Sequence, residues 1–257
     1  MNQSERRNYL IQKLLEEKPQ YAKMQIPGRC EEQKRLLRAL MNVRMPGELS
    51  EEFLRIQDTY LAEENAAKGV VTPADMEELS PEIYLWKGDI TRLQVGAIVN
   101  AANSGMTGCY QPCHNCIDNC IHTYAGIELR NYCNDIMQRQ GYAEPTGQAK
   151  ITPAFNLPCD YVIHTVGPIV RGKLTVEHES LLMSCYESCL RIAEENNLES
   201  IAFCCISTGV FMFPNEKAAE LAIQTVKQYK DRTKSKIKVI FNVFKEEDER
   251  IYRRFLG

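Results

Sequence analysis

Hydrophobic positions change their spacing along the chain, and the change divides the sequence into two parts. In the first 75 or so residues, apolar side chains such as Leu10, Leu14 and Leu15 recur at the spacing of an amphipathic helix. Proline and glycine interrupt this pattern at Pro19, at 27–28 and at 46–47. The pattern predicts helices over residues 6–17, 31–42 and 51–67, the last of them capped by Ser50.

From Ser80 onward, short apolar runs alternate with segments of helical period. The runs predict strands over residues 82–86, 97–100, 149–153, 161–166, 200–206 and 238–244. Helices are predicted between and after them, over 117–138, 179–196, 215–227 and 246–255. Such alternation is typical of a layered α/β domain with a largely parallel, buried sheet. We therefore expect a helical extension over 1–75 and an α/β domain over 76–257. The extension is interpreted as a layer that packs on the main domain, with partner binding or substrate gating as alternatives.

Composition narrows the class of protein. A hydrophobic content of 44% and a charged content of 25% are those of an ordinary soluble protein. No apolar run approaches the ~20 residues of a membrane span, and the polar start does not resemble a signal peptide. We expect a cytoplasmic protein whose eleven cysteines are mostly reduced. The net charge of −3 argues against a nucleic-acid partner.

The chemistry concentrates between the strand ending near Asn100 and the helix starting at Ile117. Three cysteines and one histidine fall within residues 109–116, and thiolates and imidazole are ligands for soft metals. Loops at the carboxyl ends of α/β strands bind ligands, and a helix N-terminus favours anions. This combination indicates metal-assisted chemistry on an anionic small molecule. Residues 113–116 also form a Cys-x-x-Cys, so a redox pair that leaves Cys109 unused is the alternative.

Five segments in order, from about Trp86 to the end, resemble the macrodomain family of ADP-ribose-binding modules. The resemblance implies a three-layer α/β/α fold with a mixed, largely parallel sheet. The segments are Gly88-Asp89-Ile90-Thr91, the Ala97-to-Asn103 run, Ile117 to His122 with Ala125-Gly126, Tyr161 to Pro168, and Ile206 to Phe211.

One departure from the family pattern identifies a subfamily. Many macrodomains carry a glycine run where this chain has residues 109–116. The substitution resembles the zinc-dependent macrodomains among microbial ADP-ribosyl hydrolases. That resemblance implies one Zn²⁺ per chain, held at the distal ribose by Cys109, His114 and Cys116. Three protein ligands leave the fourth position open, as in catalytic zinc sites. Spacing alone does not exclude Cys113, whereas Cys120 is expected in the core.

The resemblance also assigns roles to residues around the loop, each of which has a structural alternative. Asp89 would accept a hydrogen bond from the adenine amino group, beside the N–H of Ile90, or act only as a helix cap or turn residue. Asn103 would reach the distal ribose hydroxyls, or serve as a turn former. Asp118 would position water at the anomeric carbon, or only stabilise the first turn of its helix. His122 and His164 are expected to be structural.

Two further segments are expected to bind the ligand. Backbone N–H groups in a glycine-bearing loop can hold a diphosphate without a basic side chain. Phe211 would pack on the distal ribose and Phe244 would stack on adenine, and an ordinary core position is the alternative for both. The loop consists of Ser207, Thr208, Gly209, Val210 and Phe211.

These features predict a hydrolase that removes mono-ADP-ribose from modified protein side chains, with Asn103 and Asp118 in the catalytic roles. Two other functions stay open: a reader that binds ADP-ribose without cleaving it, and a redox or metal sensor on the same fold. The resemblance further implies pairing with a sirtuin-like ADP-ribosyltransferase and a lipoyl-carrier protein as target.

Overall fold

The computed structural model describes residues 1–21 and 23–257, and three helices precede the sheet. They are α1 (Gln3–Glu16), α2 (Cys30–Val43) and α3 (Glu51–Ala67), with the short 3₁₀ turn η1 (Pro19–Tyr21) after the first. Asn2 caps α1 in a reciprocal capping box with Glu5, and Ser50 caps α3 as predicted. The helices share an apolar cluster that also takes in Ile127 of the main domain. All three predicted helices are therefore confirmed, with ends shifted by at most three residues.

The main domain is built on a seven-stranded sheet in the order β1-β2-β7-β6-β3-β5-β4. All pairings from β2 to β5 are parallel, whereas the two edge strands, β1 and β4, pair antiparallel. The predicted mixed, largely parallel sheet is thus confirmed. Its strands are β1 (Glu77–Ser80), β2 (Ile83–Lys87), β3 (Ala97–Ala101), β4 (Ala149–Pro153), β5 (Tyr161–Thr165), β6 (Ser200–Phe203) and β7 (Lys238–Val243).

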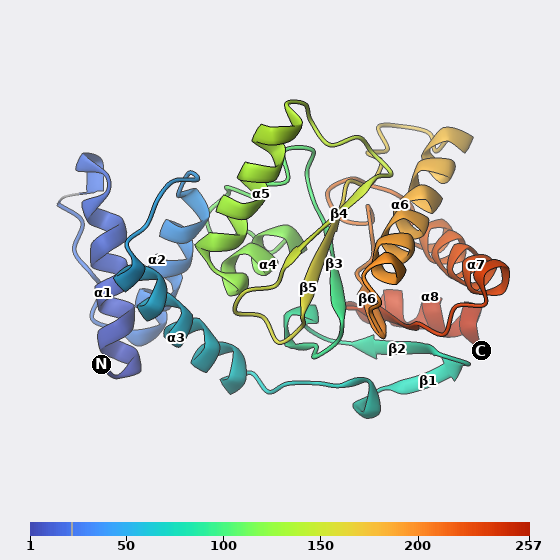
Figure 1. Ribbon diagram of the computed structural model, residues 1–257, viewed down its shortest axis with the longest axis horizontal. Helices are drawn as coiled ribbons and strands as arrows, with labels where there is room; N and C mark the ends of the chain where they lie inside the picture. Colours follow the sequence, from blue (N-terminus) through green and yellow to red (C-terminus); the bar gives the residue numbers. More distant parts are fainter. Residues whose placement is uncertain (22) are drawn as a thin grey trace.

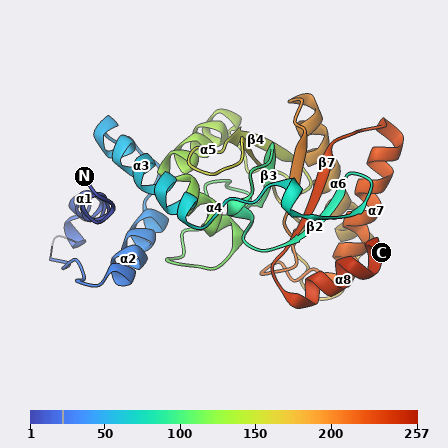
Figure 2. The ribbon, with the colours of Figure 1, turned by 90° about the horizontal axis from the view of Figure 1, so that it is seen from below.

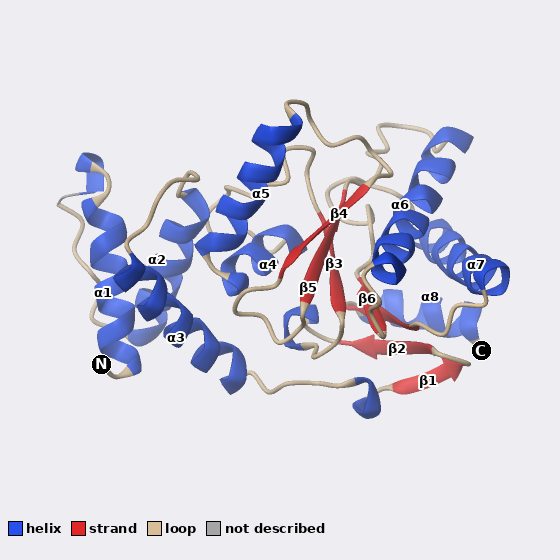
Figure 3. Cartoon of the chain, viewed as in Figure 1, coloured by secondary structure: helices blue, strands red, loops and turns tan. Residues whose placement is uncertain are grey.

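Helices cover both faces of the sheet, and the N-terminal helices form a further layer at one end of the molecule. In Figure 1, α4 (Ile117–Ala125) and α5 (Ile127–Gln140) lie on the side of the sheet that faces α1 to α3. The row α6 (Val176–Glu195), α7 (Asn215–Thr233) and α8 (Glu246–Leu256) lies on the other side, as the colouring in Figure 3 makes plain. The view in Figure 2 shows α2 and α3 directly beside α4. The extension therefore lies against the helix that follows the cysteine loop.

The central strands are buried because both of their faces are covered. Residues 97–100 of β3 and all four residues of β6 are buried, which explains their uninterrupted apolar runs. In β3, Ala97 stands opposite both Tyr161 of β5 and Ile201 of β6. This strand therefore fixes the position of the loop that leaves its carboxyl end.

Four sequence predictions need correction, and one of them is the end of α7, which extends to Thr233 instead of residue 227. The helix predicted over 117–138 is two helices, because Gly126 adopts a φ of 104° that ends α4 and starts α5. A Cβ at this position would lie 2.8 Å from Gln57 Nε2 of α3, so the break also seats the extension. Strand β1 was not predicted, since its residues are polar and partly exposed at the sheet edge. Strand β6 ends at Phe203 instead of residue 206.

Candidate active site

The expected ligand-binding residues lie along one edge of the sheet. Asp89 follows β2, Phe244 follows β7, the loop from Ser207 follows β6, and Asn103 follows β3. These four strands are neighbours in that order, and all run parallel. Their carboxyl ends therefore bring the four segments side by side at the edge where α/β sheets bind ligands.

The structure brings Cys109, His114 and Cys116 together. Their ligand atoms all lie within 4.8 Å of one another, and Cys109 Sγ is 3.6 Å from His114 Nδ1. A tetrahedral zinc with Zn–S of ~2.3 Å and Zn–N of ~2.1 Å would separate sulfur from nitrogen by about 3.6 Å. The donor set and its spacing therefore fit zinc. Burial raises the pKa of the Cys116 thiol to about 12, so a cation is needed to hold it as thiolate at neutral pH.

Cys113 and Cys120 lie outside this cluster. The Cys113 thiol donates to the carbonyl oxygen of Arg35 in α2, 3.4 Å away. Cys120 is only half-buried, not a core residue as expected, because it faces Arg38 Nη2 at 3.6 Å. Both thiols are turned towards the N-terminal layer.

Asp118 is a buried carboxylate at the start of α4. It accepts hydrogen bonds from Asn100 Nδ2 at 2.8 Å and from Asn103 Nδ2 at 3.2 Å. Burial raises the pKa of Asp118 to about 6, and these two donors oppose the rise. Two residues of one strand-to-loop segment thus fix the orientation of this carboxylate.

Asn103 and Asp89 each organise their own loop, as their structural alternatives predicted. Asn103 donates to the carbonyl oxygen of Gly108 and accepts from the N–H of Gly105. Asp89 Oδ1 accepts from the N–H and hydroxyl of Thr91 and so caps the 3₁₀ turn η3 (Ile90–Arg92). Asp89 Oδ2 accepts neither of these bonds. The side chain of Ile90 lies in the core.

Lys68, at the end of α3, is a residue that the sequence did not single out. Its Nζ lies 4.0 Å from Asp89 Oδ2 and 2.8 Å from the ring centroid of Tyr124. Burial lowers the pKa of Lys68 to about 8, against the opposing effect of the Asp89 charge. A lone lysine after a polar helix gives no signal in the sequence, because its neighbours are set by the docking of the extension.

The loop after β6 has the shape expected for backbone recognition. Ser207 has a φ of 65°, and its buried hydroxyl has no hydrogen-bond partner among the described residues. A Cβ at residue 167 would lie 2.1 Å from this hydroxyl and 2.9 Å from Cγ2 of Ile206, so glycine at this position leaves room for the loop. Thr208 and Phe211 are half-buried, whereas Gly209 and Val210 are exposed. Phe244 is 77% exposed and lies just beyond the end of β7, so it is not a core aromatic.

A second group of possible metal ligands lies in the buried core, where His164 is hydrogen-bonded and neither ring nitrogen of His122 has a hydrogen-bond partner among the described residues. His122, Cys133 and His164 are buried with ligand atoms within 4.8 Å of one another. Asn100 donates to His164 Nδ1, so His164 Nε2 carries the proton and donates to Thr152 Oγ1 at 3.0 Å. Both ring nitrogens of His164 are thus engaged in hydrogen bonds within the core. His122 and His164 are accordingly buried as expected.

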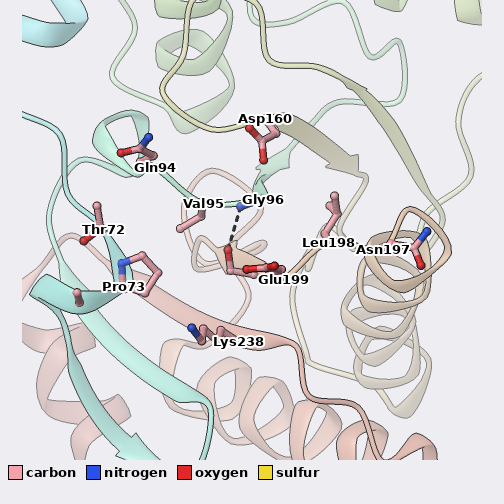
Figure 4. Close-up of a pocket in the computed structure, with 12 residues that line it drawn as sticks. Thr72, Pro73, Gln94, Val95, Gly96, Asp160, Asn197, Leu198, Glu199 and Lys238 are labelled. Atoms are coloured by element: carbon pink, nitrogen blue, oxygen red, sulfur yellow. Dashed lines mark hydrogen bonds between the residues drawn. The ribbon is translucent and has the colours of Figure 1, made fainter.

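A hollow of about 580 Å³ lies at the opposite edge of the sheet. Figure 4 shows it at the amino ends of the strands, where Gly96 donates to Ser200 Oγ at 2.9 Å. Asp160, Glu199 and Lys238 also line it, without any cluster of nucleophiles or metal ligands among them. The candidate active site is therefore placed by its side chains at the carboxyl ends of the strands, and not by this hollow.

Comparison with known proteins agrees with this geometry. The Macro domain family profile matches residues 99–222, which include the cysteine loop and the loop after β6. A Treponema medium protein named protein-ADP-ribose hydrolase is 58% identical over the whole of both chains. The chain belongs to the macrodomain family. A protein-ADP-ribose hydrolase of Staphylococcus aureus strain MRSA252 is 46% identical over 96% of this macrodomain and 94% of its own length.

Solved macrodomains share the fold. A Trypanosoma brucei macrodomain in complex with ADP-ribose is 28% identical and superposes with a TM-score of 0.66, over 85% of this chain and 95% of its own. An Oceanobacillus iheyensis macrodomain mutant with ADPR is 34% identical, with a TM-score of 0.62 over 70% of this chain and 95% of its own. No helix among the described residues of this macrodomain is long and apolar enough to cross a membrane.

Proposed function

We propose that this macrodomain hydrolyses the bond between mono-ADP-ribose and a modified protein side chain, and that it does so with one zinc ion. The observation that carries the proposal is the cluster of Cys109, His114 and Cys116. These three ligands lie in the segment between Asn103 and Asp118, whose side chains are hydrogen-bonded to each other. Relatives that match the full chain are named for this hydrolysis.

The chain's own residues supply binding and orientation. Asp89 Oδ2 offers an acceptor at one end of the sheet edge, and the backbone of residues 207–211 offers donors beside it. At the other end, Asp118 holds and orients the water that attacks the anomeric carbon. The water oxygen bonds to that carbon while the bond from the carbon to the protein side chain breaks, and its electron pair stays with the side chain. The side chain takes up the proton that the water loses, so that free ADP-ribose and the unmodified side chain are released. Zinc held by its three ligands would supply Lewis-acid chemistry at the fourth, open position.

The main rival is a reader that binds ADP-ribose without cleaving it. Binding alone gives no reason for two thiols and an imidazole beside a buried carboxylate. A redox sensor would use Cys113 with Cys116, but the Cys113 thiol is directed to Arg35 of α2. A metal sensor on the same fold would show no affinity for ADP-ribose. We further propose a lipoyl-carrier protein modified by a sirtuin-like transferase as the substrate, on the resemblance to the zinc-dependent subfamily.

Turnover and affinity measured on the same preparations test the proposal. Removing zinc with a chelator, or replacing His114→Ala, should lower release of ADP-ribose from a modified acceptor by about 100-fold or more. Affinity for free ADP-ribose should change far less, because most of the ligand contacts lie elsewhere. An ADP-ribosylated lipoyl-carrier protein should be among the acceptors. Cleavage at the wild-type rate without metal would make zinc structural, and tight binding with no release from any acceptor would favour the reader.

A further inference from the structure

The N-terminal helices contact the zinc-ligand loop, residues 109–116, through the half-buried, forked guanidinium of Arg38. Arg38 of α2 donates from Nη2 to the carbonyl oxygen of His114 at 2.7 Å. The same guanidinium donates to Asn119 Oδ1, at 2.9 Å from Nη2 and 3.3 Å from Nε. One side chain of the extension thus holds the backbone of one metal ligand and a side chain of α4.

Asn119 extends this contact to the two other ligands. It is fully buried, and its Nδ2 donates to the carbonyl oxygens of Cys109 at 3.3 Å and Gln111 at 2.9 Å. Its backbone N–H donates to Cys116 Sγ at 3.4 Å. Since Arg38 fixes Asn119, all three ligands lie within one or two hydrogen bonds of α2, a helix that ends 34 residues before the first strand of the sheet begins.

Asn42, one turn further along α2, holds the middle of the loop. Its Oδ1 accepts from the N–H of Cys113 at 2.9 Å, and its Nδ2 donates to Thr123 Oγ1 at 3.0 Å. Cys113 has a φ of 53°, a conformation that costs of order 1 kcal/mol in a residue other than glycine. The bond to Asn42 is therefore one of the interactions that keep the loop in this shape.

Arg130 of α5 ties the end of α2 to the residues just before the same loop. Its Nη1 donates to the carbonyl oxygens of Met41, Asn42 and Arg44, at 3.0, 2.8 and 2.6 Å. Its Nε donates to the carbonyl oxygen of Thr107 at 2.7 Å. A cation at a helix C-terminus is favourable, so the Arg130 guanidinium stabilises this end of α2. The contact also fixes α2 against the main domain, close to Arg38 and Asn42.

We infer that the N-terminal helical layer is a component of the metal centre, in which Arg38 and Asn42 act as positioning residues for the zinc ligands. The inference rests on the proposed zinc site. An unanchored loop would lose backbone entropy each time its three ligands converge on a metal. Partners that orient the ligands remove this cost, and their loss typically weakens metal binding by about 10- to 100-fold.

The zinc affinity of the full chain, measured by competition with a chromophoric chelator, tests the inference. Arg38→Ala and Asn42→Ala should each weaken zinc binding by about 10-fold or more. Arg38→Lys should fold more readily and still weaken binding, because an ammonium cannot reproduce the fork. Amide hydrogen exchange of the metal-free variants should speed up over residues 107–116 while the sheet keeps its protection.

Asn65→Ala is the matched control. Asn65 of α3 donates to the carbonyl oxygens of Tyr124 at 3.0 Å and Asn156 at 2.7 Å, so it joins the same layer to the domain without contacting the loop. This variant should lose stability and keep its zinc affinity. Wild-type affinity in all three loop-contact variants would overturn the inference, as would equal weakening in Asn65→Ala. Wild-type protein that takes up no zinc would overturn the proposed zinc site itself, an outcome visible without any variant.

Discussion

Asn100 holds Asp118 from the sheet side, with Nδ2 2.8 Å from Asp118 Oδ1. The second hydrogen of the same amide goes to His164 Nδ1 at 3.1 Å, and His164 in turn donates to Thr152. All of these residues are buried. The carboxylate proposed to orient water is therefore fixed by a chain of hydrogen bonds that begins in the sheet.

Replacing Asn100→Ala should lower kcat for release of ADP-ribose by about 10-fold or more, because Asp118 loses the donor that sets its orientation. The Kd for free ADP-ribose should stay near the wild-type value. The substitution should also lower the free energy of unfolding by about 1–3 kcal/mol, because Asp118 and His164 each lose a buried hydrogen-bond donor. Thr152→Val is the control, since it breaks the far end of the chain and leaves the Asp118 bond intact. An equal fall in kcat for Thr152→Val would show that stability, not orientation, was measured.

The cysteines of the loop should differ sharply in their effect on metal content. Cys109→Ala with Cys116→Ala should abolish stoichiometric zinc, because a single imidazole remains of the three ligands. Cys113→Ser should leave zinc near one per chain, since the Cys113 thiol is directed to Arg35. Elemental analysis of freshly purified protein measures both. An empty site in Cys113→Ser would mean that Cys113 is a ligand.

Two substitutions at Asp89 separate its two roles. Asp89→Asn keeps an oxygen that can cap Thr91 but places an amide where an adenine amino group needs an acceptor. It should weaken ADP-ribose binding by about 1–3 kcal/mol with little loss of stability, whereas Asp89→Ala should lose both. Calorimetry with free ADP-ribose and thermal unfolding give the two quantities. Unchanged affinity in Asp89→Asn would leave Asp89 as a cap only.

The order of strands and helices could be predicted from the sequence, because the spacing of hydrophobic residues is a local property of each segment. Two kinds of feature escape such reasoning. The break between α4 and α5 depends on one residue, Gly126, whose φ is set by the approach of Gln57. The contact between Arg38 and His114 joins residues 76 apart in sequence, so no local pattern could predict it. The sequence could place the candidate site residues at one edge of the sheet, because parallel strands present their carboxyl ends there; their roles stay predictions.

His164 should make the protein more sensitive to acid. Its ring is fully buried, and burial lowers its pKa to about 3, against ~6.5 in an unfolded chain. Between these values the unfolded chain binds a proton that the folded chain does not, so the free energy of unfolding falls as pH falls. The slope is roughly 1.4 kcal/mol per pH unit below pH ~6.5, and no effect is expected above it.

His164→Gln lacks the titrating ring, so it should be less stable than wild type at pH 7.5 and lose less on acidification. Urea unfolding of both proteins at pH 7.5, 6 and 5, with chelator present to keep His114 metal-free throughout, should show the gap narrowing. A constant gap would contradict the prediction. It would mean that His164 takes up a proton in the folded protein as readily as in the unfolded chain, although Nδ1 accepts a hydrogen bond from Asn100.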